Sequence, residues 1–74
     1  MEISVNGEPR QIAEGATIQQ LLQELRLAPE RLVVEVNLTI LKRAEHATRI
    51  LNAGDCVEIV HFVGGGASVP ECRA

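Results

Sequence analysis

The stretch that decides the fold is Gly54-Asp55-Cys56-Val57-Glu58-Ile59-Val60-His61-Phe62-Val63-Gly64-Gly65-Gly66. A turn at residues 53–55 opens it, and residues 56–63 form the longest strand candidate in the chain. Because side chains alternate along a strand, one face carries Val57, Ile59, His61 and Val63, and the other carries Cys56, Glu58, Val60 and Phe62. Three consecutive glycines follow, and none of them has a Cβ atom. The chain therefore leaves its last strand as a slim arm with great backbone freedom.

A β-hairpin is expected at the N-terminus. Residues 2–6 alternate polar and apolar side chains, which is the pattern of a half-buried strand. Asn6-Gly7 favours a type I′ turn, because both central residues of that turn need a positive φ. Residues 8–12 return as the second strand, and Pro9 suits the edge of a sheet.

One main helix follows the hairpin. Thr17 stands three residues before Gln20, which is the spacing of a capping box at a helix N-terminus. A single apolar stripe comes next at helical spacing and consists of Ile18, Leu21, Leu22 and Leu25. We expect the helix to end near Arg26, because Ala28 precedes a proline and is disfavoured in the α region.

The second half of the chain supplies more strands. Residues 32–37 are rich in β-branched side chains and predict a central strand, residues 39–41 predict a short one, and residues 44–47 predict a helical turn. A chain of 74 residues has room for one domain. The economical α+β solution is a mixed four- to five-stranded sheet wrapped around one main helix, which is the β-grasp or ubiquitin-like fold.

Composition excludes several classes of function. The net charge of −3 and a single aromatic residue, Phe62, argue against a nucleic-acid binder. The sequence has no run of about 18 apolar residues that could span a membrane. Its N-terminus lacks the pattern of a signal peptide, so we expect a cytoplasmic protein. Cys56 and Cys72 lie too far apart for a zinc or redox motif. Cys56, within an apolar segment, is expected in or beside the core.

The sequence does not resemble that of an enzyme. It contains no nucleophile paired with a base, no nucleotide-binding loop and no metal-ligand cluster, so we expect no bound cofactor and no metal. We expect His46 to be solvated in a loop, His61 to have a structural role in its strand, and the carboxylates to lie on solvated faces. The glycine arm remains, and taken alone it fits a flexible linker as well as a reactive terminus.

The segments 34–37, 42–43 and 51–66 resemble the ThiS family of thiamine-biosynthesis sulfur carriers, and residues 6–7 and 17–25 fit the same family. The resemblance covers residues 1–66. It implies a β-grasp fold and a carrier role, in which a ubiquitin-activating-like adenylyltransferase (ThiF) uses ATP to adenylate a terminal glycine. A sulfur donor protein would then supply sulfur for a thiocarboxylate, which passes it to thiazole synthase (ThiG). By position, Gly66 is the acyl residue and Gly64 and Gly65 form the flexible arm. Phe62 and Val63 are the candidates for docking on these partners.

The chain departs from the family pattern in two places. Lys42 precedes Arg43 where a proline is common, and His46 stands near the place of an aromatic residue. Residues 67–74 follow the glycines, whereas family members usually end there, so we divide the chain into a domain at 1–66 and a flexible extension at 67–74. Related carriers with such extensions are matured by a zinc-dependent JAMM-type peptidase, and the resemblance implies that cleavage after Gly66 activates this chain.

Other readings stay open at this point. The carrier could serve a cysteine-type or siderophore-type pathway instead of thiamine biosynthesis. The chain could also be a non-covalent ubiquitin-like interaction module that keeps the fold without processing. A molybdopterin-synthase small subunit would share the fold, but the match at residues 54–66 disfavours it.

Overall fold

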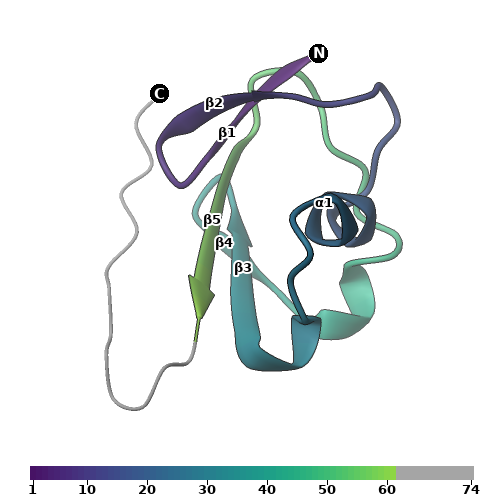
Figure 1. The fold of residues 1–74 in the computed structure, drawn as a ribbon, viewed down its shortest axis with the longest axis vertical. Helices are drawn as coiled ribbons and strands as arrows, with labels where there is room; N and C mark the ends of the chain where they lie inside the picture. Colours follow the sequence, from purple (N-terminus) through teal and green to yellow (C-terminus); the bar gives the residue numbers. More distant parts are fainter. Residues whose placement is uncertain (62–74) are drawn as a thin grey trace.

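A computed structural model describes residues 1–61 of the chain. Five strands form one mixed sheet in the order β2-β1-β5-β3-β4 (Figure 1). The strands are β1 (Glu2–Val5), β2 (Glu8–Gln11), β3 (Leu32–Val36), β4 (Thr39–Leu41) and β5 (Cys56–His61). Strand β5 is central: it runs parallel to β1 and antiparallel to β3. The two hairpins, β1–β2 and β3–β4, therefore lie on either side of the last described strand.

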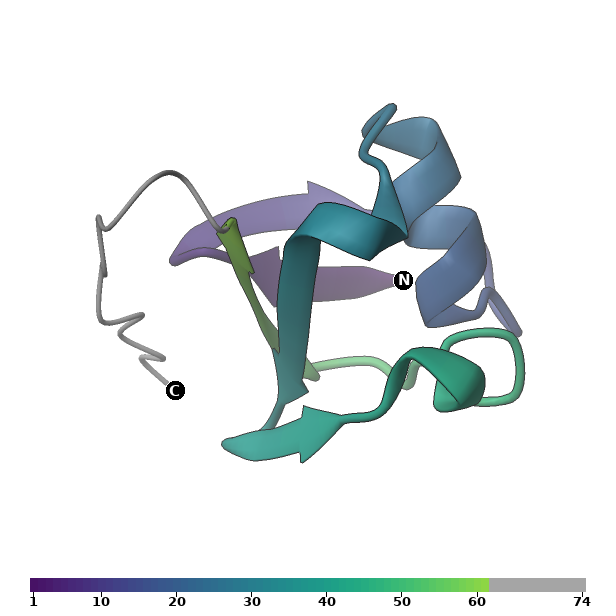
Figure 2. The same ribbon diagram turned by 90° about the horizontal axis from the view of Figure 1, so that it is seen from below.

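The helix α1 (Ile18–Glu24) covers one face of this sheet, as the view in Figure 2 shows. Two short 3-10 turns, η1 (Pro29–Arg31) and η2 (Arg43–Glu45), flank strands β3 and β4 in the sequence. The predicted α+β fold, a mixed sheet wrapped around one helix, is confirmed. The predicted helical turn is present as η2, which lies slightly earlier in the chain than residues 44–47.

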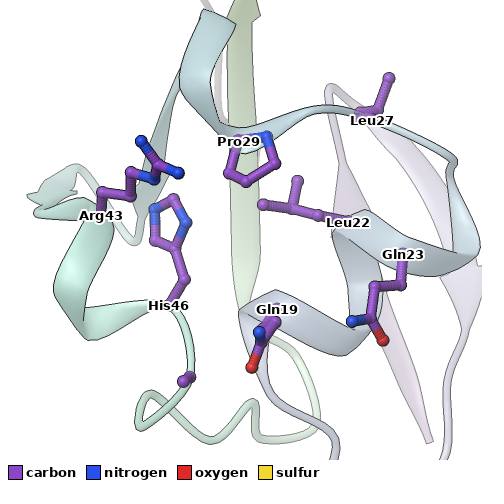
Figure 3. A pocket seen from close by; sticks show the side chains of 8 residues that line it. Gln19, Leu22, Gln23, Leu27, Pro29, Arg43 and His46 are labelled. Carbon is purple, nitrogen blue, oxygen red and sulfur yellow. The ribbon is translucent and has the colours of Figure 1, made fainter.

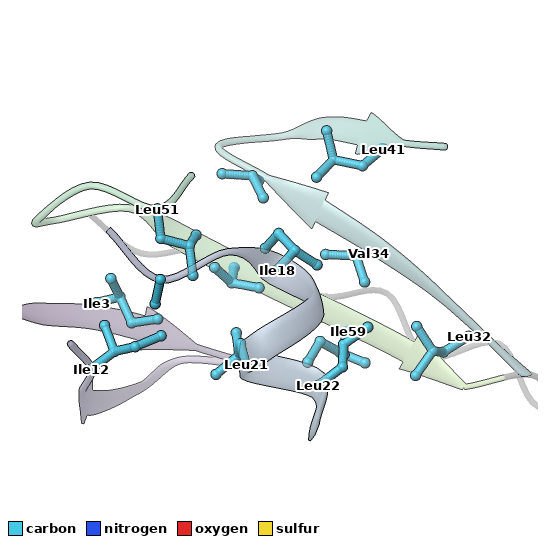
Figure 4. Packing of buried hydrophobic residues seen from close by; sticks show 13 residues of the cluster. Ile3, Ile12, Ile18, Leu21, Leu22, Leu32, Val34, Leu41, Leu51 and Ile59 are labelled. Carbon is cyan, nitrogen blue, oxygen red and sulfur yellow. The ribbon is translucent and has the colours of Figure 1, made fainter. Parts of the chain in front are cut away.

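The core lies between α1 and the sheet (Figure 4). The predicted helix stripe supplies Ile18, Leu21 and Leu22, each no more than 2% exposed. The sheet face opposite them contributes Val34 and Val57, both fully buried. Burying an aliphatic side chain of this size stabilises a fold by about 1.5–3 kcal/mol. This contact explains why a seven-residue helix, too short to be stable in water, persists here.

Local sequence signals start and stop the elements. The Thr17 side chain accepts a hydrogen bond from the Gln20 backbone N–H, and the Gln20 side-chain oxygen accepts one from the Thr17 backbone N–H, so the predicted capping box is confirmed. The helix itself ends at Glu24, with Leu25 as its C-cap. Arg26 adopts a left-handed conformation with φ 58°, and the chain turns away there.

Both hairpins close through turns with two consecutive positive φ angles. Asn6 and Gly7 have φ 50° and 82°, as the type I′ prediction requires. In the second hairpin, Asn37 and Leu38 have φ 51° and 70°. Leucine is an unusual residue in this region because its Cβ crowds the backbone, so the second turn carries local strain that the first avoids.

Three expectations about burial are wrong. His46 is buried, at 5% exposed, because it packs beside α1 and its carbonyl accepts a hydrogen bond from the Gln19 backbone at 2.9 Å. Asp55 and Glu58 are also buried, rather than lying on a solvated face. Cys56 is buried as expected, but it alternates with Val57 and so lies on the sheet face away from the core.

Candidate functional site

The predicted site residues Phe62, Val63 and Gly64–Gly66 lie outside the residues that the structure describes. The described part of the site is therefore strand β5, which leads toward them and whose last residue is His61. His61 is exposed and lies opposite Leu32 of β3. The His61 side chain makes no hydrogen bond within residues 1–61, so its expected structural role stays a prediction.

Strand β5 is fixed on one side by Asn6. The Asn6 Oδ1 atom accepts a hydrogen bond from the Ile59 backbone at 2.7 Å, and its Nδ2 atom donates to the Ile59 carbonyl at 3.4 Å. The backbone N–H of Asn6 also donates to the Val57 carbonyl at 2.9 Å. A turn residue of the first hairpin thereby continues the ladder between β1 and β5 toward the exit of the chain.

At its start, β5 is fixed by a second asparagine. The Asn37 Oδ1 atom accepts from the Cys56 backbone at 2.9 Å, and its Nδ2 atom donates to Asp55 Oδ1 at 3.1 Å. The other oxygen of Asp55 accepts from the Asn52 backbone at 2.8 Å and lies 4.0 Å from the Arg49 guanidinium. Asp55 therefore closes the turn before β5 and has a structural role.

A groove lies beside the end of β5, with a volume of about 420 Å³. Its apolar walls come from Val5 of β1, Ile59 of β5, and Leu25 and Leu27 after the helix. Polar residues on its rim are Asn6, Glu8, Arg10 and His61, and Pro9 completes the lining. The groove lies next to His61, the last residue that the structure describes.

A second apolar surface lies on the β3–β4 hairpin. Leu38 at its turn is 72% exposed, and Ile40 on the edge strand β4 is 64% exposed. Sequence reasoning considered docking only near Phe62 and Val63 and missed these two side chains. One feature of the sequence could have indicated the exposed Leu38: it follows the asparagine of a tight turn, where polar residues or glycine are usual.

His46 lies on the helix side of the sheet and borders a pocket between α1, the segment after it and η2 (Figure 3). Burial and the nearby Arg43 guanidinium lower the pKa of His46 below 6.5, and Glu45 opposes them more weakly. Its Nδ1 atom is buried and has no hydrogen-bond partner within residues 1–61. The imidazole is therefore neutral at physiological pH.

Other kinds of site are not built by the described residues. Among residues 1–61, no three His, Cys, Asp or Glu side chains gather into a group that could hold a metal ion. Within the same part of the chain, no helix is both long and apolar enough to cross a membrane.

Among the described residues, a mixed sheet surrounds one helix and β5 is its central strand; with a glycine run following β5 in the sequence, this arrangement defines a small ubiquitin-like protein. The ThiS family model matches residues 3–66, and the chain belongs to the ThiS family. It is 42% identical over 53 residues to the sulfur carrier protein ThiS of Bacillus subtilis, covering 72% of this chain and 80% of that protein. The crystal structure of thiamine biosynthesis protein ThiS from Geobacter metallireducens superposes with a TM-score of 0.78 at 36% identity, covering 89% of this chain and 100% of that one.

The chain is also similar to larger proteins. It is 40% identical over 70 residues to the thiazole synthase of Magnetococcus marinus, which is 95% of this chain but 22% of that protein. A second thiazole synthase, from Paramagnetospirillum magneticum, matches at 39% identity over 21% of its length. This chain thus spans about a fifth of the length of these two relatives.

Proposed function

We propose that this chain is a sulfur carrier for thiazole formation in thiamine biosynthesis, with Gly66 as its working residue. Membership of the ThiS family is the observation that carries the proposal, because the matched region ends at Gly66. The geometry of β5 supports it: a central strand, held by Asn6 and Asn37, gives the glycine arm a rigid base. The protein itself then needs no catalytic residue, since partner enzymes do the chemistry.

The chemistry begins with a carboxylate, which is a poor electrophile. A ThiF-like adenylyltransferase would join the Gly66 carboxylate to the α-phosphate of ATP and release pyrophosphate. The resulting acyl-adenylate has a good leaving group. A sulfur nucleophile from a donor protein then attacks the carbonyl carbon and displaces AMP. When the donor is a persulfide, a second thiol releases the thiocarboxylate by reducing the intermediate disulfide.

The acceptor in this proposal is a ThiG-like thiazole synthase. Two proteins of that name contain a stretch similar to this chain, which favours thiazole formation over cysteine-type or siderophore-type pathways. In those relatives, a ThiS-like segment belongs to the same polypeptide as the rest of the synthase. A carrier so placed would meet its acceptor at high effective concentration.

Residues 67–74 make the carrier latent in this proposal, because the Gly66 carbonyl is held in a peptide bond with Ala67. Hydrolysis of that bond adds one water and yields the Gly66 carboxylate and the Ala67 amine. A zinc-dependent JAMM-type peptidase is the class of enzyme proposed for this step. Maturation would then control when adenylation starts.

Intact mass spectrometry of the protein from its native cell tests the proposal. We expect a form that ends at Gly66, and a second form heavier by the difference between one sulfur and one oxygen atom. A chain that keeps residues 67–74 under thiamine starvation, with no form ending at Gly66, would contradict the carrier function. That result would favour a non-covalent ubiquitin-like interaction module.

Reconstitution separates maturation from sulfur transfer. The chain ending at Gly66 and the full chain are each incubated with a ThiF-type adenylyltransferase, ATP and sulfide. We expect the thiocarboxylate only on the shorter chain, and we expect Gly65→Val in that chain to abolish it because a bulky side chain obstructs a narrow channel. Modification of neither chain would count against the proposal.

A further inference from the structure

Two buried residues of β5 lie on the outer face of the sheet, which is the face turned away from α1. Cys56 and Glu58 alternate along the strand with the core residue Val57, so they belong to this outer face. They are only 7% and 1% exposed, although α1 covers the opposite face (Figure 2). Side chains on an uncovered sheet face normally reach solvent. Burial this deep therefore points to a further segment that lies over the start of β5.

The sulfur of Cys56 identifies that segment. Cys56 is half of a disulfide. The chain has two cysteines, so the partner available within one molecule is Cys72, in the extension that follows the glycines. The Cys56 Sγ atom lies 4.0 Å from Oε1 of Glu58, so a segment joined to this sulfur would cover the carboxylate as well.

The chain is long enough to return to Cys56. Along β5, Cys56 and His61 are separated by roughly 17 Å, since each residue of a strand advances about 3.3 Å. Residues 62–72 can span up to about 36 Å when extended, so they can reverse direction and still reach the start of β5. Gly64–Gly66 stand near the middle of this stretch, and glycine permits the backbone angles that a reversal needs.

The charges of the outer face favour the same segment. Glu35 of β3 lies opposite Glu58 of β5, so two carboxylates share this face. Charged side chains are almost never as buried as Glu58 unless they are paired. Arg73 follows Cys72 directly and is the one basic residue in the sequence of residues 67–74. A disulfide at Cys72 would bring the Arg73 guanidinium within reach of these carboxylates.

We propose that residues 67–74 fold back onto the outer face of the sheet and are held there by a reversible disulfide between Cys56 and Cys72. Its formation joins two thiols and releases two protons and two electrons. A small-molecule disulfide such as oxidised glutathione accepts them and becomes two thiols, and the exchange passes through a mixed disulfide with one cysteine. In a reducing compartment such bonds are transient and redox-sensing, so the extension acts as a redox-controlled latch.

The latch has a consequence for maturation, and this consequence rests on the proposed function. Hydrolysis of the bond between Gly66 and Ala67 adds one water, but residues 67–74 stay attached through Cys72. Two electrons from a thiol reductant must then break the disulfide before the extension leaves. Reductant, and not the peptidase alone, therefore controls release. A native cell that never cleaves the chain would count against the proposed function and leave the latch standing.

Thiol titration of the full chain tests the disulfide. The chain is equilibrated with mixtures of reduced and oxidised glutathione, quenched with N-ethylmaleimide and weighed by intact mass spectrometry. We expect a monomer that is lighter by two hydrogens and takes no label. The effective concentration of the two thiols should be at least about tenfold higher in the folded chain than in concentrated guanidinium, because the folded face holds the extension. Equal values in the two conditions, covalent dimers, or glutathione adducts in place of this monomer would overturn the proposal.

Amide spectra of the ¹⁵N-labelled full chain test where the extension lies. Oxidation should shift the amides of Val33 and Glu35 on the neighbouring strand β3, and leave those of Gln19 and Gln23 on α1 unshifted. Cys72→Ser alters the extension alone, so in reductant its spectrum should match that of the reduced chain. Shifts confined to the sequence neighbours of Cys56 would overturn the placement on the outer face.

Arg73→Ala tests the charge pairing. It should lower the effective concentration of the two thiols by roughly tenfold, as expected for the loss of a hydrogen bond between charged groups. Glu71→Ala is the matched control, because it truncates an acidic side chain in the same segment and should not lower that value. An equal fall in both variants would overturn the pairing of Arg73 with the outer face.

Discussion

The side-chain oxygen of Asn6 accepts a hydrogen bond from the backbone N–H of Ile59 at 2.7 Å, although 53 residues separate them in the sequence. Asn6 also occupies the left-handed region, with φ 50°, which starts the turn of the first hairpin. Asparagine is one of few residues that tolerate this conformation while offering a side-chain acceptor. The residue that reverses the chain at β1 thus also fixes the strand that leads to the glycine arm.

Asn6→Ala should lower the free energy of unfolding by about 2 kcal/mol. About half of this loss comes from the hydrogen bonds to Ile59, and the rest from placing an alanine at positive φ. Asn6→Gly is the matched control, because glycine adopts the turn without strain and loses only the bonds, which costs about 1 kcal/mol. Urea denaturation followed by circular dichroism measures both. Equal losses of unfolding free energy in the two variants would show that backbone strain at positive φ contributes nothing.

Asp55→Ala should destabilise the fold by about 2–3 kcal/mol, because it removes the two partly buried hydrogen bonds that the carboxylate accepts from Nδ2 of Asn37 and from the backbone N–H of Asn52. Asp55→Asn should cost less, since its amide oxygen can still accept one of these bonds. Glu14→Ala, at an exposed position before α1, serves as the surface control and should change stability by less than about 0.5 kcal/mol. Thermal unfolding of the three variants checks the order, and an Asp55→Ala variant as stable as the control would refute the structural role of this carboxylate.

The parts of the fold that the sequence predicts correctly depend on near neighbours. Asn6-Gly7 needs only its own φ preferences to predict a turn, and Thr17 and Gln20 form their capping box within one helical turn. The spatial order of the strands is not among these predictions, because the pairing of β5 with β1 and β3 joins segments far apart in the chain. Element ends were less exact: the helix ends at Glu24 rather than near Arg26, where the left-handed residue lies.

The errors concern residues whose surroundings are set by distant segments. His46, which follows η2, is buried beside α1, and its carbonyl accepts a hydrogen bond from the Gln19 backbone. These two segments are far apart in the chain, and the neighbours of His46 in the sequence give no sign of the contact. Asp55 is buried beside the β3–β4 hairpin, where Nδ2 of Asn37 donates a hydrogen bond to its carboxylate. The proposed role of Gly66 came from family resemblance, and it stays a prediction because the glycine arm lies outside residues 1–61.

The titration of His46 should make the stability of the protein depend on pH. Burial and Arg43 lower its pKa in the folded state below the value of 6.5, so the unfolded chain binds more protons as the pH falls through this region. Stability is therefore fully present above about pH 6.5 and decreases as the pH falls below it. His46→Phe should flatten this decrease, measured as the urea midpoint across that range. His61→Gln, which alters the exposed histidine at the end of β5, is the control, and a decrease that survives in His46→Phe would assign the effect to other groups.

Leu38→Gly should stabilise the protein, by about 1 kcal/mol, even though it removes a large apolar side chain. Leu38 is 72% exposed and has φ 70°, so glycine relieves backbone strain and gives up little buried surface. Ile40→Gly provides a contrast two residues away: its side chain is similarly exposed, but its backbone is that of strand β4, so glycine there should destabilise by about 1 kcal/mol. If urea denaturation shows that the free energy of unfolding rises in Leu38→Gly and falls in Ile40→Gly, the effect is due to backbone conformation. Destabilisation by both variants would show instead that the Leu38 side chain stabilises the hairpin.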